Sequence, residues 1–222
     1  MISIVELLDA GKIARIRELA ASATFVDGKT TAGGRARRVK NNELMQPDSP
    51  AAQESRKLIL DALGANKAFS RVAFPRRIQP PMINRYTPGM TYGAHVDNAL
   101  LNNQPMLRAD IAMTLFISEP GEYEGGELAI DGDFGRHKLK RPAGQMIVYP
   151  ASSLHQVMPV TSGTRIVAVS WANSYIREPA RRQILFDLER VRHKLNELAT
   201  DSPEADLAFK TYSNLMRMWA EV

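Results

Sequence analysis

Apolar residues at the start of the chain recur first with the spacing of a strand and then with that of a helix. Residues 2–6 alternate as a short strand does, and Asp9 is a suitable N-cap for a helix that follows. Ile13, Ile16 and Leu19 then fall on one helical face. The pattern predicts a strand followed by an amphipathic helix.

Two further segments precede the middle of the chain. Residues 24–40 contain Asp27-Gly28 and Gly33-Gly34, which favour hairpin turns or an irregular loop. Residues 51–63 have helical periodicity, and Gly64 is expected to end that helix. The predicted buried side of the helix consists of Leu58, Ile59, Ala62 and Leu63.

Between Phe69 and Asn173 the pattern changes to short β-prone runs separated by proline and glycine. Strands are predicted at residues 69–74, 81–86, 91–97, 110–117, 127–130, 145–149, 154–158 and 165–173. No helical run separates these segments, which favours an antiparallel sandwich or barrel over a βαβ sheet. Jelly-roll and cupin-like double sheets belong to that class.

Helical periodicity returns after Glu178. A long helix is predicted, with an apolar stripe formed by Ile184, Leu188, Val191, Leu195 and Leu198. Ser202 is a suitable cap for a last helix starting at Pro203, whose inner side would contain Leu207, Tyr212, Leu215 and Trp219. The stripe could pack on the β core or on a partner subunit, so these helices are candidates for a homo-oligomer contact.

The pattern as a whole predicts an α+β chain with helices before and after a β core. We expect one domain at residues 1–175, with its β core at about 69–175, and a helical extension at residues 176–222.

Composition narrows the class of protein only a little. The 222 residues are 44% hydrophobic and 24% charged, as in an ordinary globular protein, and no apolar run is long enough for a bilayer span. The first residues lack the basic start of a secretory signal, so the cytoplasm is the expected compartment. The absence of cysteine excludes disulfides, cysteine nucleophiles and thiolate-bound metals.

The net charge of +5 raises the question of nucleic-acid binding. The basic residues occur in short, scattered groups: Arg35, Arg37, Arg38 and Lys40; Arg76 and Arg77; Lys138, Lys140 and Arg141; Arg181 and Arg182. None of these groups is interleaved with aromatic residues, as a platform for single strands is. The charge therefore indicates a solvated surface with a modest attraction for anions, and nucleic acid is not an expected partner.

The chain has four histidines, and two of them have surface-like surroundings. His193 lies beside Arg192 and Lys194 on the predicted long helix, and His137 lies among basic residues after the turn at 132–135. Both are expected to face solvent. His95 and His155 remain as candidates for chemistry.

His95 and Asp97 are two residues apart in a predicted strand, so their side chains would point to the same side. His155, in another predicted strand, could supply a third ligand to the same cation. Two histidines and one carboxylate with other positions left open suit an iron(II) site, although zinc accepts the same residue types. The alternative is a surface histidine next to a turn-capping aspartate.

Arg165 strengthens the interpretation of this site. Pro159 is expected to end the strand of His155, residues 161–164 to form a turn, and Arg165 to begin the next strand, close to His155 laterally. A guanidinium at the start of an apolar strand suggests that it pairs with an anion. The far carboxylate of a metal-bound dicarboxylate would suit the bidentate geometry of arginine.

Several stretches resemble prolyl 4-hydroxylase-type oxygenases in the same order. They are residues 84–97 (NRYTPGMTYGAHVD), 125–128 (GGEL), 148–157 (VYPASSLHQV) and 159–165 (PVTSGTR). The chain is most similar to the bacterial PKHD-type hydroxylases, and the likeness extends to the turn at 25–28 and to the tail at 176–222. The resemblance therefore covers nearly the whole chain.

The resemblance implies a double-stranded β-helix that uses iron(II) and 2-oxoglutarate, with L-ascorbate, to hydroxylate a substrate with dioxygen. His95, Asp97 and His155 would be the iron ligands. Arg165 would pair with the distal carboxylate of 2-oxoglutarate, and Tyr86 could donate a hydrogen bond to the same molecule. The segment between Asn98 and Asp110 is a candidate lid because it is long and borders the ligands.

The substrate is not determined by these residues, since one fold of this kind serves many reactions. A peptide, a protein side chain and a small metabolite are all compatible. Two other functions remain open: a non-catalytic cupin-like sensor of a metal or ligand, and an oxidative nucleic-acid demethylase. The demethylase is disfavoured because the segment after Arg165 contains no second arginine.

Overall fold

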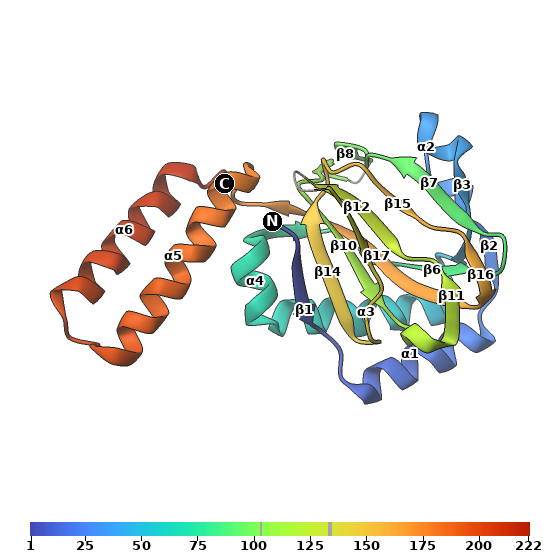
Figure 1. Cartoon of the computed structure of the whole chain (residues 1–222), viewed down its shortest axis with the longest axis horizontal. Coiled ribbons are helices and arrows are strands. Elements are labelled where there is room, and N and C mark those ends of the chain that lie inside the picture. Colours follow the sequence, from blue (N-terminus) through green and yellow to red (C-terminus); the bar gives the residue numbers. More distant parts are fainter. Residues whose placement is uncertain (103, 133–134) are drawn as a thin grey trace.

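The computed structural model describes residues 1–102, 104–132 and 135–222. Its core consists of two antiparallel sheets packed face to face (Figure 1). The larger sheet has the order β1 (Ser3–Glu6), β14 (Gln145–Pro150), β10 (Ile111–Phe116), β17 (Arg165–Ser174), β6 (Met82–Tyr86), β4 (Glu43–Met45) and β2 (Phe25–Asp27), with β5 (Pro75–Ile78) also paired to β17. The smaller sheet has the order β13 (Gly135–Leu139), β12 (Leu128–Gly132), β15 (His155–Val157), β7 (Thr91–His95) and β3 (Lys40–Asn41).

Two short strand pairs complete the β structure. β8 (Leu100–Leu101) pairs with β9 (Leu107–Arg108), and β11 (Tyr123–Gly125) pairs with β16 (Val160–Gly163). The pairing of β16 corrects the expectation of a simple turn at residues 161–164. The other predicted strands, from 81–86 to 165–173, are all present, and no boundary is shifted by more than two residues. The expected double-stranded β-helix is confirmed.

The larger sheet is buried on both faces because its central strands carry apolar residues on both sides. In β10, Ile111, Met113 and Leu115 pack towards the helices, whereas Ala112 and Phe116 pack between the two sheets. Successive residues of a strand point to opposite faces, which explains this division. The apolar residues between the sheets form a core cluster of their own, and some of them line a cavity.

Helices α1 (Ala10–Ser22), α3 (Pro50–Ala65) and α4 (Lys67–Ala73) cover the outer face of the larger sheet. Asp9 caps α1 as predicted, and its carboxylate accepts a hydrogen bond from the Lys12 amide. α3 continues one residue beyond Gly64 and ends at the cap residue Asn66, so Gly64 is not the stop.

The strand predicted at 69–74 is wrong, since residues 69–73 belong to α4 and Phe74 is its C-cap. The Asn66 side chain accepts a hydrogen bond from the Phe69 amide and caps the helix. Phe69, Val72 and Ala73 then lie on one helical face and are buried against the core. The residues of this segment favour a strand by propensity. The Asn66 cap and the burial of one helical face outweigh that propensity.

The segment at 24–40 is more ordered than a loop. After β2 it forms a short 3-10 helix, η1 (Gly28–Thr31), and then α2 (Gly34–Arg38). α2 lies against β7, next to the smaller sheet (Figure 1). A second 3-10 turn, η2 (Pro120–Glu122), precedes β11.

Two C-terminal helices, α5 (Pro179–Leu198) and α6 (Pro203–Trp219), form a hairpin that extends away from the sheets (Figure 1). Both helices were predicted, but the packing of α5 was not: Leu185 is buried, while Ile184, Val191 and Leu198 are exposed. On α6, Leu207 is also exposed, whereas Tyr212, Leu215 and Trp219 pack around Leu185. A homo-oligomer contact through the exposed residues stays a prediction. No helix in the described ranges is long and apolar enough to cross a membrane.

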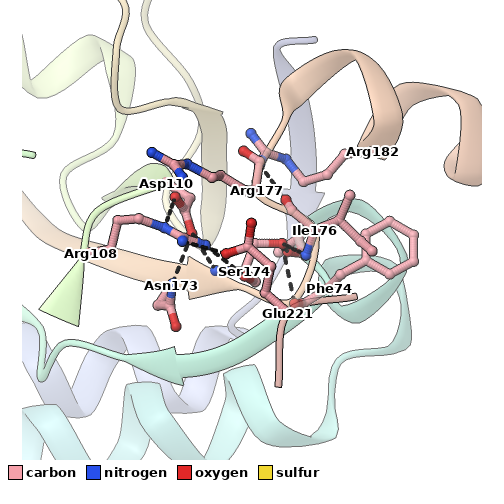
Figure 2. Close-up of polar contacts among 10 residues, drawn as sticks. Phe74, Arg108, Asp110, Asn173, Ser174, Ile176, Arg177, Arg182 and Glu221 are labelled. Atoms are coloured by element: carbon pink, nitrogen blue, oxygen red, sulfur yellow. Dashed lines mark hydrogen bonds and ion pairs between the residues drawn. The ribbon is translucent and has the colours of Figure 1, made fainter. Parts of the chain in front are cut away.

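A polar cluster joins this hairpin to the β core (Figure 2). The Asp110 carboxylate accepts hydrogen bonds from the Arg108 and Asn173 side chains and from the Ser174 amide. Arg108 also donates to Glu221 near the C-terminus, at 2.5 Å. Arg182 of α5 donates to the carbonyl oxygens of residues 176 and 177, at 2.7 and 2.8 Å. The buried charges at this junction therefore have partners within the chain.

Candidate metal and co-substrate site

The structure brings the three predicted ligands together. β7 and β15 are neighbours with His95 opposite His155, and Asp97 follows two residues after the end of β7. The His95 Nε2 and His155 Nε2 atoms lie 3.9 and 3.8 Å from Asp97 Oδ1. One ligand atom from each of the three residues falls within 4.8 Å of the others. All three side chains are nearly inaccessible to solvent.

Backbone carbonyl groups orient both imidazole rings. His95 Nδ1 lies 2.8 Å from the Gly93 oxygen, and His155 Nδ1 lies 3.0 Å from the Ser153 oxygen. A carbonyl oxygen only accepts, so Nδ1 carries the proton in each ring and the Nε2 lone pair is directed at the cluster. Asp97 Oδ2 is buried and has no hydrogen-bond partner among the described residues.

Burial sets the protonation of the cluster. Desolvation, with a further contribution from nearby His155, lowers the pKa of His95 to about 4, so its ring is neutral at physiological pH. Desolvation also raises the pKa of Asp97, an effect that His155 and Lys40 partly oppose. A neutral His95 ring and an unsatisfied Asp97 carboxylate are suited to binding a divalent metal.

Aromatic rings fix the histidines from the side. The Tyr92 ring is stacked on His95, with centroids 3.6 Å apart and an angle of 15° between the planes. Tyr149 meets His155 edge-on at 5.2 Å. These contacts restrict the rotation of both rings and exclude water from that side of the cluster.

Arg165 lies near the cluster, but not where the sequence reasoning placed it. β17 belongs to the larger sheet and β15 to the smaller one, so Arg165 is not on a strand lateral to His155. The chain crosses between the sheets through β16, and Arg165 is paired in register with Tyr86 of β6. The Arg165 guanidinium lies 5.0 Å from the centre of the Tyr86 ring. It therefore faces the cluster across the space between the sheets.

The Arg165 side chain is 1% exposed, and its Nε and Nη1 atoms have no hydrogen-bond partner in the described part of the chain. Glycine makes room for it: a Cβ atom at Gly126, where φ is +66°, would lie 2.9 Å from Arg165 Cδ. The hydroxyl of Tyr123, beside the same space, is also buried without a partner. An unpaired buried guanidinium is costly, which indicates that this position is built for an anion.

Tyr86 is buried beside Arg165, and both residues line the same cavity. Burial raises the pKa of the Tyr86 hydroxyl, an effect partly opposed by Arg165, so that the hydroxyl remains protonated and able to donate. The cavity has a volume of about 360 Å³ and contains the three cluster residues as well.

Several lining residues were not found by sequence reasoning. Lys40 and Thr31 lie on one side of the cavity, Asn42 and Asn84 on another, and Trp171 on β17. Apart from the spacing of Lys40 and Asn42 in a short extended segment, no local pattern marks them. They are separated in sequence and converge only when the two sheets close.

The two other histidines lie on the surface, and the predicted lid borders the cavity. His137 and His193 are exposed, as expected, and His193 pairs with Glu197 at 3.2 Å. In the predicted lid, Leu100, Leu101 and Asn102 line the cavity, and β8 and β9 form a small hairpin. Residue 103 of this segment, and residues 133–134 in the turn before His137, lie outside the described residues.

Comparisons with known proteins agree with this geometry. Residues 81–173 match the family model of the 2OG-Fe(II) oxygenase superfamily, and residues 180–221 match the PKHD-type hydroxylase C-terminal domain. The fold is also that of a prolyl-4-hydroxylase from Pseudomonas putida, with a TM-score of 0.55, 17% identity, and 78% of this chain and 92% of that chain covered. A double sheet whose cavity contains two histidines and a carboxylate is thus the structure of a 2-oxoglutarate-dependent dioxygenase.

Relatives similar over their whole length define the family more narrowly. PKHD-type hydroxylases of Phenylobacterium zucineum and of a Synechococcus strain are 42% and 44% identical to the chain, with 100% of each sequence covered. The chain belongs to the PKHD-type hydroxylase family. It is therefore an enzyme of the iron(II)- and 2-oxoglutarate-dependent class, and the alternative of a non-catalytic sensor is set aside.

Proposed function

We propose that His95, Asp97 and His155 hold iron(II), and that Arg165 binds the distal carboxylate of 2-oxoglutarate, in an enzyme that hydroxylates a C–H bond. The observation that carries the proposal is the pairing of two unsatisfied features in one cavity. One is the cluster of three potential ligands, and the other is the buried Arg165 guanidinium, whose Nε and Nη1 atoms find no partner among the described residues.

The three residues fit a divalent metal by the chemistry of their donors. Both imidazoles present Nε2, and Asp97 Oδ2 lacks any other partner among the described residues. Two histidines and one carboxylate leave coordination positions open, which suits an iron site that must accept further ligands. A cation in the cluster would also remove the cost of burying the Asp97 carboxylate.

The opposite wall fits a dicarboxylic co-substrate. Arg165 offers two nitrogen atoms, Nε and Nη1, that lack a partner among the described residues. We assign the protonated hydroxyl of Tyr86 as a further donor to the co-substrate. Bidentate pairing with a carboxylate satisfies a buried guanidinium better than a single acceptor does. The co-substrate would then extend from Arg165 towards the metal cluster.

When bound, iron and 2-oxoglutarate activate dioxygen, placing one oxygen atom in the substrate and the other in succinate as carbon dioxide leaves. The chain's own residues orient the reactants and keep water from them. Tyr92, Tyr149 and the apolar layer between the sheets enclose the cluster from behind. Residues of α2 and of β8 also line the cavity, so we expect the substrate to enter beside these elements. We expect L-ascorbate to support turnover by keeping the iron reduced.

The test measures metal binding and turnover together. Wild-type protein with iron(II), ascorbate and 2-oxoglutarate should release succinate slowly even without substrate. Asp97→Ala should lower the affinity for Mn(II), measured calorimetrically under argon, and abolish succinate release. Equal succinate release by the two proteins would contradict the proposal. The exposed His137→Ala variant is the matched control and should behave as wild type.

A further inference from the structure

Lys40 is a buried cation for which the proposed iron and 2-oxoglutarate sites provide no role. It lies on β3, in register with Tyr92 of β7, and its side chain lines the cavity. The residue is only 6% exposed. Its Nζ atom donates to Thr31 Oγ1 at 2.7 Å and lies 5.0 Å from the centre of the Tyr92 ring.

The Lys40 ammonium group lacks hydrogen-bond partners for some of its donors. It has three donors, and Thr31 accepts one of them; the described residues offer it no ion pair and no second hydrogen-bond acceptor. Burial lowers the pKa of Lys40 to about 8, although Asp97 and Asp27 oppose the shift. The group is therefore still charged near neutral pH. A buried charge that is left unpaired reduces stability, as the Arg165 guanidinium does.

Thr31 positions Lys40 and has no hydrogen left to donate to an anion. Its hydroxyl donates to the Gly28 carbonyl oxygen at 2.9 Å while accepting from Lys40. The remaining Lys40 donors are consequently the ones that can meet a bound molecule. Tyr92 connects them to the cluster, because the same ring that lies under Lys40 is stacked on His95.

The two cations of the cavity lie on different sheets. Arg165 comes from β17 and stands beside Tyr86, whereas Lys40 comes from β3 and stands beside Tyr92. A cavity of about 360 Å³ is at the small end of the usual range for ligand sites, roughly 300–1,000 Å³. It can accommodate the co-substrate and one further small group, which would meet Lys40.

The rim of the cavity carries more positive charge. Ala36 of α2 lines the cavity, and the neighbouring Arg35, Arg37 and Arg38 are exposed. Within the described ranges none of these three arginines forms an ion pair. Positive charge at the rim of a cavity attracts anionic ligands towards it.

We propose that the substrate carries an oxyanion, such as a carboxylate or phosphate, which binds to the Lys40 ammonium close to the carbon that is hydroxylated. The proposal rests on the function proposed above and names the class of its substrate. A free small acid and an acidic side chain of a peptide present the same chemistry. The size of the cavity means that only a small acidic group enters, whatever it is attached to.

Binding is tested first with minimal probes. Acetate and inorganic phosphate are titrated into the protein loaded with Mn(II) and 2-oxoglutarate, with acetamide as the neutral control. We expect the two anions to bind, acetamide not to bind, and Lys40→Met to lose the binding. The affinities of Lys40→Met for Mn(II) and 2-oxoglutarate should remain those of wild type. Loss of either affinity would mean that Lys40 supports the metal cluster and would overturn the proposal.

Turnover is tested next with iron(II), 2-oxoglutarate and paired compounds. One arm compares small carboxylic acids with their carboxamides, and the other compares glutamate-containing peptides with the same peptides containing glutamine. We expect acids in one arm to stimulate succinate release and their neutral partners not to do so. Lys40→Met should raise the concentration for half-maximal stimulation on the order of 100-fold, and Lys40→Arg should raise it less. The exposed Lys138→Met should change nothing.

The two proposals fail in different ways. Absence of succinate release from the wild type, with or without added compounds, would contradict the proposed function. Succinate release that neutral amides stimulate as well as acids would contradict only the assignment of an anionic substrate. Stimulation by acids that Lys40→Met leaves unchanged would also overturn the role of Lys40.

Discussion

Two buried polar clusters in this molecule differ in whether their charges have partners. At the junction with the helical hairpin, Asp110 accepts hydrogen bonds from Arg108, Asn173 and Ser174 (Figure 2). Between the sheets, Arg165 and Asp97 each retain buried polar atoms with no partner in the described part of the chain. The first cluster is complete as it stands, whereas the second is completed only by something bound.

The contrast is clearest between two arginines of similar burial. Arg182 is 4% exposed and donates to two carbonyl oxygens, so its burial is compensated by the chain itself. Arg165 is 1% exposed and leaves Nε and Nη1 unpaired. Burial of a charge therefore indicates a structural role at the junction, where the charge is paired within the chain. In the cavity it indicates a binding site, because the charge is left for a ligand. Variants in the two clusters should accordingly affect different measurements.

The largest effect on stability is expected at the junction. Asp110→Ala removes the acceptor for two side chains and a backbone amide, leaving donors buried without partners. The free energy of unfolding should fall by about 3–4 kcal/mol, measured by denaturant titration. Asp131→Ala, which breaks the exposed pair with Arg136, is the matched control and should have little effect. An Asp110→Ala protein as stable as wild type would show that the junction is not held by this cluster.

Arg165→Met, in contrast to Asp110→Ala, should impair binding of the co-substrate and not the stability of the fold. Removing an unpaired buried cation should leave the free energy of unfolding equal to or higher than that of the wild type. The dissociation constant for 2-oxoglutarate, measured calorimetrically with Mn(II) under argon, should rise on the order of 100-fold. Affinity for Mn(II) alone should be retained, since Arg165 belongs to the opposite sheet. Loss of the metal together with the co-substrate would indicate that Arg165 is structural, like Arg182.

Lys40→Met should stabilise the protein at neutral pH. The pKa of Lys40 is lowered from 10.5 to about 8 by burial, so the unfolded chain binds the proton more tightly than the folded chain. The charged form therefore costs stability in full below pH 8, on the order of 2–3 kcal/mol, and the cost disappears as the pH rises towards 10.5. Asp97 and Asp27 are the charged groups that act on Lys40, and both are retained in the variant. Removing Lys40 takes away one of the influences that lower the pKa of Asp97.

The stability difference should be followed by denaturant titration between pH 7 and 10.5. It should favour Lys40→Met at pH 7 and decrease steadily above pH 8. A variant less stable than wild type at pH 7 would show that the Thr31 hydrogen bond and the Tyr92 contact outweigh the cost of burying the charge.

Whether a site residue could be predicted from the sequence depends on how local its pattern is. His95 and Asp97 share a local spacing, and His155 and Arg165 lie in a recognisable strand pattern, so the cluster was predicted from short segments. Lys40 was not, because its contacts with Thr31 and Tyr92 come from other elements and its strand has only two residues. The division into domains at residue 175 stays a prediction.

Packing accounts for the errors in the fold. At 69–74 the β-prone residues were placed in a strand, yet the Asn66 cap and the helical spacing of Phe69, Val72 and Ala73 produce α4. In α5 the most regular apolar stripe is largely exposed, whereas Leu185, outside it, is buried with Phe74 and Ile176. Periodicity shows that a helix is amphipathic, but the neighbouring elements decide which face is covered.

The smallest effect is expected at the edge of the junction. Glu221 is half-exposed, and its carboxylate accepts from Arg108, which lowers the pKa of Glu221. A lowered pKa means that the pair stabilises the folded chain above the usual glutamate range and that this stabilisation is lost as the pH falls. Glu221→Gln should therefore shift the thermal midpoint only slightly at pH 7, and not at all below pH 4 or in 1 M salt. A large shift that persists in high salt would mean that the C-terminal residues, and not the Asp110 cluster alone, hold the hairpin against the core.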